Sequence, residues 1–141
     1  DALPIFAKYD LPIRVVVEDV ATALPDVKAD VVVANPPYIP NDEKLPIEVA
    51  KFEPEMALRG GPVDGMQIPK LFIDAATRLL KPGGLLIIDQ ALSGGKVADP
   101  TQRDPESIAR RDAIKVVKED ARWSSSVIPI GAGILVAHKL A

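Results

Sequence analysis

The sequence predicts an α/β fold in which a mostly parallel sheet packs against helices and ends in a C-terminal antiparallel hairpin. Three patterns lead to this prediction: continuous apolar runs, helical periods between them, and a Gly-rich turn between the last two apolar segments. The 141 residues are 48% apolar and 26% charged, a composition typical of one globular domain. We therefore assign residues 1–141 to a single domain and interpret residues 1–10 as a linker or non-native segment.

Three apolar runs predict the strands of the parallel part of the sheet. Residues 14–17 and residues 29–34 are rich in valine, and residues 85–89 are rich in leucine and isoleucine. The runs are continuous rather than alternating, which is typical of strands that are buried on both faces.

Two helices and a hairpin complete the predicted elements. Residues 67–80 carry apolar side chains with the period of an amphipathic helix, and Pro69 is allowed in the first turn of that helix. A weaker apolar period predicts a second helix over residues 105–121. Residues 126–130 and 134–140 flank a short Gly-rich connection, which predicts two antiparallel strands.

Residues 39–63 are rich in proline and acidic residues and show no sustained period. A connection of this length without regular structure is uncommon inside a domain, and such segments are often functional. We therefore expect this segment to be a loop that belongs to the functional site.

Composition disfavours several function classes. The net charge of −3, from 17 basic and 20 acidic residues, provides no broad cationic field for a nucleic acid. Without cysteine the chain has no thiolate nucleophile or cysteine metal site, and its only histidine, His138, cannot form a metal site alone. The apolar runs are far shorter than the roughly 20 residues of a membrane-spanning helix. We predict neither a metal nor a membrane partner.

The sequence Asn35-Pro36-Pro37-Tyr38 follows a predicted strand, at the edge of the sheet where α/β folds bind ligands. The Asn35 side-chain oxygen and the Pro36 carbonyl can accept both N–H groups of a planar nitrogen and thereby orient its lone pair toward a methyl donor. Pro37 stiffens the turn. Tyr38 offers a flat face on which an amide or a base can stack. The alternative is a simple turn, because Asn and Pro are ordinary turn residues.

From this motif outward, the sequence resembles the HemK/PrmC-type protein-(glutamine-N5) methyltransferases, which modify the Gly-Gly-Gln loop of peptide-chain release factors. Four segments, found at residues 30–40, 52–58, 60–65 and 80–84, carry the resemblance. It extends over about residues 15–89 and is weak beyond them. The tetrapeptide alone is shared with adenine-N6 DNA and guanine-N2 RNA methyltransferases, so the glutamine subtype depends on the other three segments.

The resemblance implies an S-adenosylmethionine-dependent methyltransferase with a Rossmann-like class I sheet and a cytoplasmic location. It implies that Asn35, Pro36, Pro37 and Tyr38 are the catalytic and substrate-binding residues. It also implies that Asp19 and Val20, together with Asn35, hold the adenosine part of the cofactor. A solvated carboxylate and a core aliphatic remain the alternative interpretation of Asp19 and Val20. For Glu53 we favour a role in bracing the loop.

The family also uses a Gly-rich loop after its first strand and an acidic residue after its second. This sequence contains neither, because its Gly131-Ala132-Gly133 joins two predicted strands and opens no helix. We therefore expect the C-terminal portion of a methyltransferase domain, without the first two strands of its sheet. Cofactor binding would then be impaired, the segment at 14–17 would be loosely attached or differently paired, and exposed strand edges would favour association.

The resulting function is a fragment of an S-adenosylmethionine-dependent N-methyltransferase that acts on the glutamine amide of a release factor. Methylation of adenine N6 or guanine N2 in a nucleic acid is one alternative. An inactive fragment or a non-enzymatic binding module is the other. Residues 88–92 depart from the family pattern, which leaves the substrate subtype open.

Overall fold

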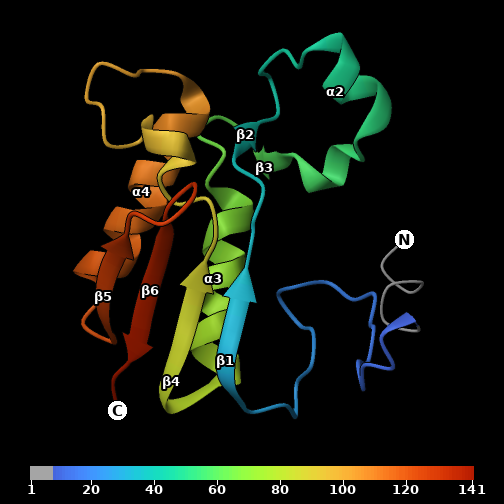
Figure 1. Ribbon diagram of the computed structural model, residues 1–141, viewed down its shortest axis with the longest axis vertical. Coiled ribbons are helices and arrows are strands. Elements are labelled where there is room, and N and C mark those ends of the chain that lie inside the picture. The colour runs from blue at the N-terminus through green and yellow to red at the C-terminus, as the bar shows by residue number, and fades with distance from the viewer. Residues whose placement is uncertain (1–7) are drawn as a thin grey trace.

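The computed structural model describes residues 8–141, and a four-stranded sheet lies at its centre (Figure 1). The strands are ordered β1 (Ala29–Ala34), β4 (Leu80–Ile88), β6 (Ile134–Lys139) and β5 (Trp123–Ile128). β1 and β4 are parallel, whereas β6 runs antiparallel to both β4 and β5. The predicted fold class and the C-terminal hairpin are confirmed, although β5 begins earlier than predicted.

Two helices cover one face of this sheet (Figure 1). α3 (Gln67–Leu79) carries Pro69 in its first turn, as the sequence predicts. α4 (Pro105–Glu119) begins at Asp104, whose side chain accepts a hydrogen bond of 2.9 Å from the Ser107 amide and so caps the helix. Both helices therefore form where their apolar periods predict them.

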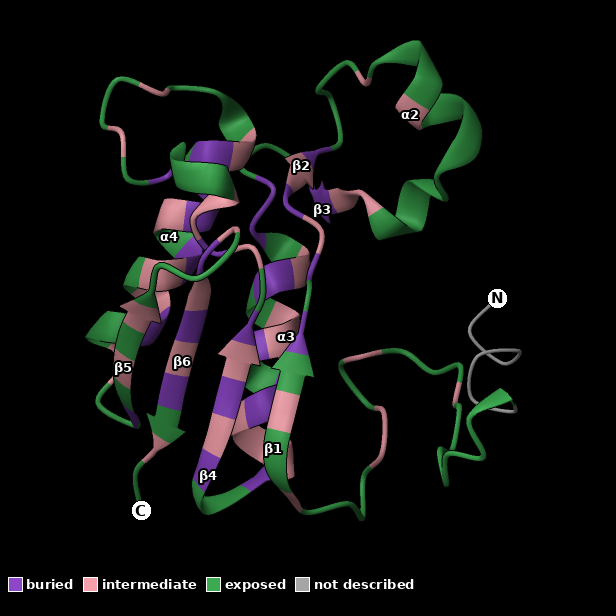
Figure 2. Cartoon of the chain, viewed as in Figure 1, coloured by how far each residue is buried: buried purple, intermediate pink, exposed green. Residues whose placement is uncertain are grey.

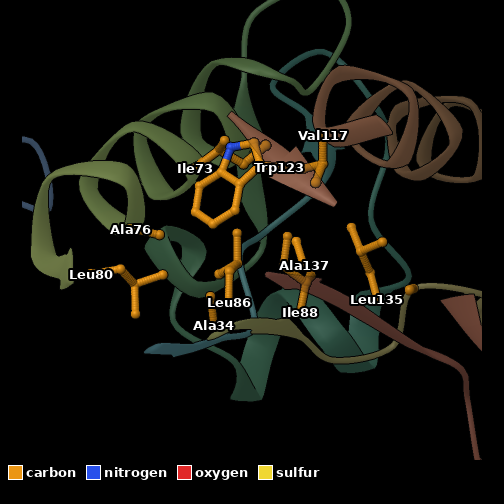
Figure 3. Packing of buried hydrophobic residues seen from close by; sticks show 11 residues of the cluster. Ala34, Ile73, Ala76, Leu80, Leu86, Ile88, Val117, Trp123, Leu135 and Ala137 are labelled. Carbon is orange, nitrogen blue, oxygen red and sulfur yellow. The ribbon is translucent and has the colours of Figure 1, made fainter. Parts of the chain in front are cut away.

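The hydrophobic core lies between the two helices and the sheet (Figure 3). Leu86 and Ile88 of β4 alternate with half-buried residues, so that every second side chain points toward α3. Other elements complete this cluster with Ala34, Ile73, Ala76, Leu80, Ala91, Val117, Trp123, Leu135 and Ala137. Burial of each large aliphatic side chain contributes about 1.5–3 kcal/mol, so this cluster fixes the sheet whose edge carries the site.

The segment that precedes β1 departs from the predictions. Residues 14–17 form no strand and lie mostly exposed, so the predicted strand is wrong. Valine favours a strand only where another strand can pair with it, and the described residues give this segment no such partner. β1 is likewise not buried on both faces, because Val31 and Val33 are 48% and 70% exposed. As Figure 2 shows, β1 lies at the edge of the sheet.

The predicted structureless segment at residues 39–63 is a small lobe with structure of its own (Figure 1). β2 (Ile39–Pro40) and β3 (Arg59–Gly61) pair in parallel, and α2 (Ile47–Phe52) and the 3₁₀ turn η1 (Glu55–Ala57) lie between them. These elements are too short to leave a period in the sequence. A second 3₁₀ turn, η2 (Ser93–Gly95), follows β4.

Among the described residues, no helix combines the length and the apolar character that crossing a membrane requires.

Candidate functional site

The tetrapeptide predicted to carry the chemistry begins directly after β1. The amide of Asp89 donates a 3.0 Å hydrogen bond to the carbonyl of Ala34, which ties the end of β4 to the end of β1. Beyond this bond, Asn35 is exposed while Pro36 is buried. The two prolines that follow β1 stiffen the backbone, and this backbone presents the amide side chain of Asn35 to solvent.

Asn35 lines a cavity of about 980 Å³ (the volume that solvent can reach), together with Pro37. Asp19 and Val20, the residues expected to hold adenosine, line the same cavity although they lie far away in the sequence. The structure therefore brings four of the six predicted site residues together. Pro36 and Tyr38 do not line it.

The remaining wall of the cavity divides into a polar and an apolar part. Asn41, Arg59 and Gln67 supply further amide and guanidinium groups. The apolar part comes from the chain before β1, from η1 and from α3, through residues such as Val17, Met56, Ile68, Leu71 and Phe72. A mostly apolar cavity with a few convergent polar groups is the usual form of a small-molecule site.

Asp19 lies at the cavity wall although no strand precedes it, because a local turn holds its backbone. One carboxylate oxygen accepts a 2.8 Å hydrogen bond from the amide of Ala21, which closes a tight turn. This turn is tied to α3, because Arg78 donates to the carbonyl of Ala23 at 2.8 Å and Lys28 donates to the carbonyl of Arg78 at 2.7 Å. The hydrogen bonds of Arg78 and Lys28 thus hold the segment that contains Asp19 against α3.

Tyr38 does not line the cavity and is only 3% exposed. Its ring packs with Met66 and with Ala109 and Ala113 of α4, and the guanidinium of Arg110 lies 4.3 Å from the ring centre. Burial raises the pKa of the Tyr38 hydroxyl to about 12. The stacking face that the sequence suggested is not presented to the cavity, and the ring has Arg110 as its partner instead.

Two glycines explain why the segment at residues 60–65 accompanies the tetrapeptide. Gly65 has φ +67°, and a Cβ there would collide with the carbonyl oxygen of Tyr38. A Cβ on Gly60 would collide with the carbonyl of Gly65 and would lie 2.8 Å from the carbonyl of Pro37. The backbone after β3 therefore packs directly on the backbone of the tetrapeptide.

Arg59, rather than the predicted Glu53, braces the small lobe. Its guanidinium donates to the carbonyls of Pro40 and Glu43 at 2.7 and 2.8 Å and contacts Glu55 at 3.4 Å. Glu53 remains exposed beside these residues. In the sequence, Arg59 stands out only as a basic residue at the end of an acidic segment, which is weak evidence for a structural role.

His138 lies away from the site, opposite Leu85 near the start of the regular β1–β4 pairing. In the part of the chain from residue 8 onward, no three histidine, aspartate or glutamate side chains cluster in a way that could hold a metal ion.

Comparison with known proteins identifies relatives over parts of the chain. A candidate O-methyltransferase of Mycobacterium avium is 39% identical over 66 residues, which are 47% of this chain and 30% of that protein. A release factor glutamine methyltransferase of Bifidobacterium longum is 40% identical over 92 residues, which are 64% of this chain and 31% of that protein. The chain spans about a third of the length of these curated relatives.

A solved structure confirms the fold. A candidate caffeoyl-CoA O-methyltransferase from Staphylococcus aureus matches with a TM-score of 0.64 and 18% identity, over 98% of this chain and 57% of that chain. The expected Rossmann-like class I methyltransferase sheet is therefore present, with the parallel pair β1–β4 and the antiparallel hairpin β5–β6.

The family match lies in the second half of the sequence. Residues 66–140 match the family model described as O-methyltransferase, and these residues include α3, β4, α4 and the hairpin but not the tetrapeptide. The Bifidobacterium longum relative supports the expected resemblance to glutamine methyltransferases, whereas the family model is of the O-methyltransferase type. Since the match covers more than half of the residues, the chain belongs to the O-methyltransferase family of S-adenosylmethionine-dependent methyltransferases.

Proposed function

We propose that this chain carries the acceptor side and part of the adenosine side of a methyltransferase site, and that the acceptor is a glutamine side-chain amide of a release factor. The observation that carries the proposal is the exposed Asn35 at the wall of a cavity that Asp19 and Val20 also line. One cavity thus contains the group suited to hold an acceptor and the groups suited to hold a donor.

The residues present fit S-adenosylmethionine. A cavity of about 980 Å³ is at the upper end of the range for small-molecule sites. The Asp19 carboxylate can accept hydrogen bonds from ribose hydroxyls, and Val20, Leu71 and Phe72 can contact an adenine ring. When bound, the cofactor supplies an electrophilic methyl group. We expect weak binding to this chain alone, because its cradle contains no glycine-rich loop.

Asn35, which lines the cavity, would orient the acceptor. The Asn35 side-chain oxygen can accept an N–H group of a carboxamide and so fix the plane of the amide. The nitrogen lone pair is perpendicular to that plane and can then face a methyl donor. With the methyl group that the bound cofactor would supply, Asn35 would hold the amide nitrogen for the transfer, and one N–H proton would pass to solvent. Catalysis by this arrangement depends on orientation rather than on a general base.

The similarity to the release factor enzyme of Bifidobacterium longum supports the glutamine acceptor and extends over 64% of this chain. A release factor as substrate would place the reaction in the cytoplasm. Methylation of a nucleic-acid amino group stays the alternative on the acceptor side, because the Asn35 oxygen could hold such a planar amino group as well.

A hydroxyl acceptor is the second candidate function. The family model and the Mycobacterium avium relative are both of the O-methyltransferase type. The match to the family model begins after the tetrapeptide, so it does not bear on the residues that would contact the acceptor. We rank a hydroxyl second for that reason.

Cofactor binding is the first test of the proposal. Calorimetric titration of S-adenosylmethionine into the folded chain should give saturable binding that Asn35→Ala weakens. Asn41→Ala is the matched control, because it removes the same amide from the same cavity outside the tetrapeptide, and it should have a smaller effect. A folded chain that binds no cofactor would contradict the proposal.

Acceptor choice is the second test. The chain is incubated with methyl-labelled S-adenosylmethionine and, in separate reactions, a Gly-Gly-Gln release-factor domain, a catechol or a single-stranded oligonucleotide. Label on the glutamine of the release factor is the expected result. Label on the catechol would instead support O-methylation, and label on the oligonucleotide would support a nucleic-acid acceptor.

A further inference from the structure

A buried arginine of α4 contacts the tetrapeptide through Tyr38, which does not line the cavity. Arg110 of α4 is only 7% exposed, and its guanidinium stacks on the ring of Tyr38 at 4.3 Å from the ring centre. Such cation–π contacts are stronger when, as here, both groups are largely withdrawn from water. Tyr38 is therefore held between α4 and the backbone of Gly65, which lies against its carbonyl oxygen.

The same guanidinium also reaches the loop that leaves the neighbouring strand. One terminal nitrogen of Arg110 donates a 2.6 Å hydrogen bond to the carbonyl of Gln90, just beyond the end of β4. The other terminal nitrogen and Nε both donate to one carboxylate oxygen of Glu106, at 2.6 and 3.1 Å. One side chain thus contacts the segments that follow β1 and β4, at the edge where the cavity lies.

Arg111, the next residue in the sequence, contacts a different part of the protein and can therefore serve as a control for Arg110. Arg111 donates to the backbone carbonyls of the loop after η2, namely those of Lys96, Val97, Asp99 and Gln102. It therefore organises that loop, whereas the tetrapeptide has Arg110 as its partner. Two arginines on one helix can consequently be compared with each other.

Stability alone is a poor explanation for Arg110. Removal of a charge from water is costly, and buried ion pairs often contribute less to stability than apolar side chains of similar size. Ala109 and Ala113 on the same helix already supply apolar contacts to Tyr38. What a flat, five-donor guanidinium adds is fixed geometry, because it stacks on a ring and binds a carbonyl at the same time.

We propose that Arg110 is a positioning residue, which acts through Tyr38 and the Gln90 carbonyl to hold Asn35 in the orientation that faces the cavity. The two prolines transmit this restraint, because a Pro-Pro segment has little backbone freedom between Asn35 and Tyr38. For its catalytic consequence the inference rests on the proposed function. The contact joins the segment that matches the family model to the tetrapeptide, which precedes that segment.

The position of the ring can be measured without any activity. The chain contains two tyrosines, so Tyr9→Phe leaves Tyr38 as the only one, and 3-fluorotyrosine then gives a single fluorine NMR signal. We expect Arg110→Met to shift and broaden this signal and Arg110→Lys to have an intermediate effect. The control Arg111→Met should leave the signal unchanged. If Arg110→Met also left it unchanged in a folded protein, the inference would be wrong.

The kinetic consequence is tested in the acceptor assay. Arg110→Met should lower kcat about 10- to 100-fold, the usual result of misplacing reacting groups by about 1 Å, while S-adenosylmethionine affinity changes less than twofold. Arg110→Lys should recover part of kcat, which a loss of stability alone would not explain. Equal kcat values in the Arg110 and Arg111 variants would overturn the positioning role.

The two failures can be told apart. If the unsubstituted chain methylates no acceptor, the proposed function fails, and the fluorine signal still decides whether Arg110 holds Tyr38. If Arg110→Met does not fold, Arg110→Lys keeps the buried charge, and its fluorine signal and kcat provide the same comparison.

Discussion

Asn35 and Tyr38 belong to one short segment but have opposite surroundings. Asn35 is exposed at the cavity wall, whereas Tyr38 is buried against α4. The first therefore has the freedom to contact a ligand, and the second anchors the segment. Substitutions at these two positions should separate function from stability.

Asn35→Ala should change the free energy of unfolding by less than about 0.5 kcal/mol, because the side chain is exposed and makes no hydrogen bond within the described part of the chain. Chemical denaturation followed by circular dichroism measures this quantity. A large loss of stability would mean that weaker cofactor binding in this variant reflects unfolding.

Tyr38 should make stability depend on alkaline pH. Burial raises the pKa of its hydroxyl in the folded state to about 12, above the value of about 10 in an unfolded chain. The unfolded state therefore loses its proton first, so the contribution of Tyr38 is complete below pH 10 and decreases as the pH rises toward 12. The decrease amounts to about 2–3 kcal/mol over this range.

Denaturation of the unsubstituted chain and of Tyr38→Phe at pH 9 to 11.5 provides the test. Phenylalanine keeps the ring but cannot ionise, so its stability should fall less steeply with pH. Parallel curves for the two proteins would show that burial does not hold the Tyr38 proton.

Among the elements, the turn between β3 and α3 is most closely connected to the site. Gly65 has φ +67°, and a Cβ there would meet the carbonyl oxygen of Tyr38. Gly94 in η2 has nearly the same conformation, φ +64°, but a Cβ there would have no atom within 4 Å. The two glycines differ in their surroundings and not in their backbone conformation.

Gly94→Ala should cost about 1–2 kcal/mol, the usual penalty for a left-handed conformation with a Cβ. Gly65→Ala should cost clearly more, because the Tyr38 backbone must also move. Denaturation midpoints give both values. Equal costs would show that the close approach at Gly65 relaxes freely.

The helices and strands also show which parts of the fold could be predicted from the sequence. α3 and α4 could be predicted because their apolar periods are local features of the sequence. The strand expected at residues 14–17 and the lack of regular structure expected at residues 39–63 were wrong, since strand pairing and short helical turns depend on tertiary partners. The second segment does contribute Asn41 and Arg59 to the cavity wall, as its expected place in the site requires. Asn35 could be found because it belongs to a local sequence motif. Arg110 and Arg59 could not be found, because their roles depend on tertiary contacts that the sequence does not reveal.

At the scale of the whole molecule, the sheet is covered unevenly. α3 and α4 pack on one face, and β1 lies at the edge with Val31 and Val33 exposed (Figures 1 and 2). An edge strand with exposed valines presents unpaired backbone groups beside apolar surface. Self-association through this edge is the expected consequence.

Val33→Lys should therefore reduce association without loss of the core, because charged residues on edge strands oppose strand pairing. Val63→Lys is the control, since Val63 is also exposed, at 87%, but lies in a turn. Sedimentation over a range of concentrations measures the effect. Equal behaviour of both variants would exclude β1 as the contact.

The contact between Arg110 and Tyr38 also means that the tetrapeptide can be packed only after α4 has been synthesised. Asn35 and Tyr38 leave the ribosome long before α4 does, so the tyrosine ring at first has none of its α4 partners. Domains assemble as units once their last packing element is available. A nascent chain that ends before α4 therefore carries the complete tetrapeptide in its sequence but has not yet assembled it as a site.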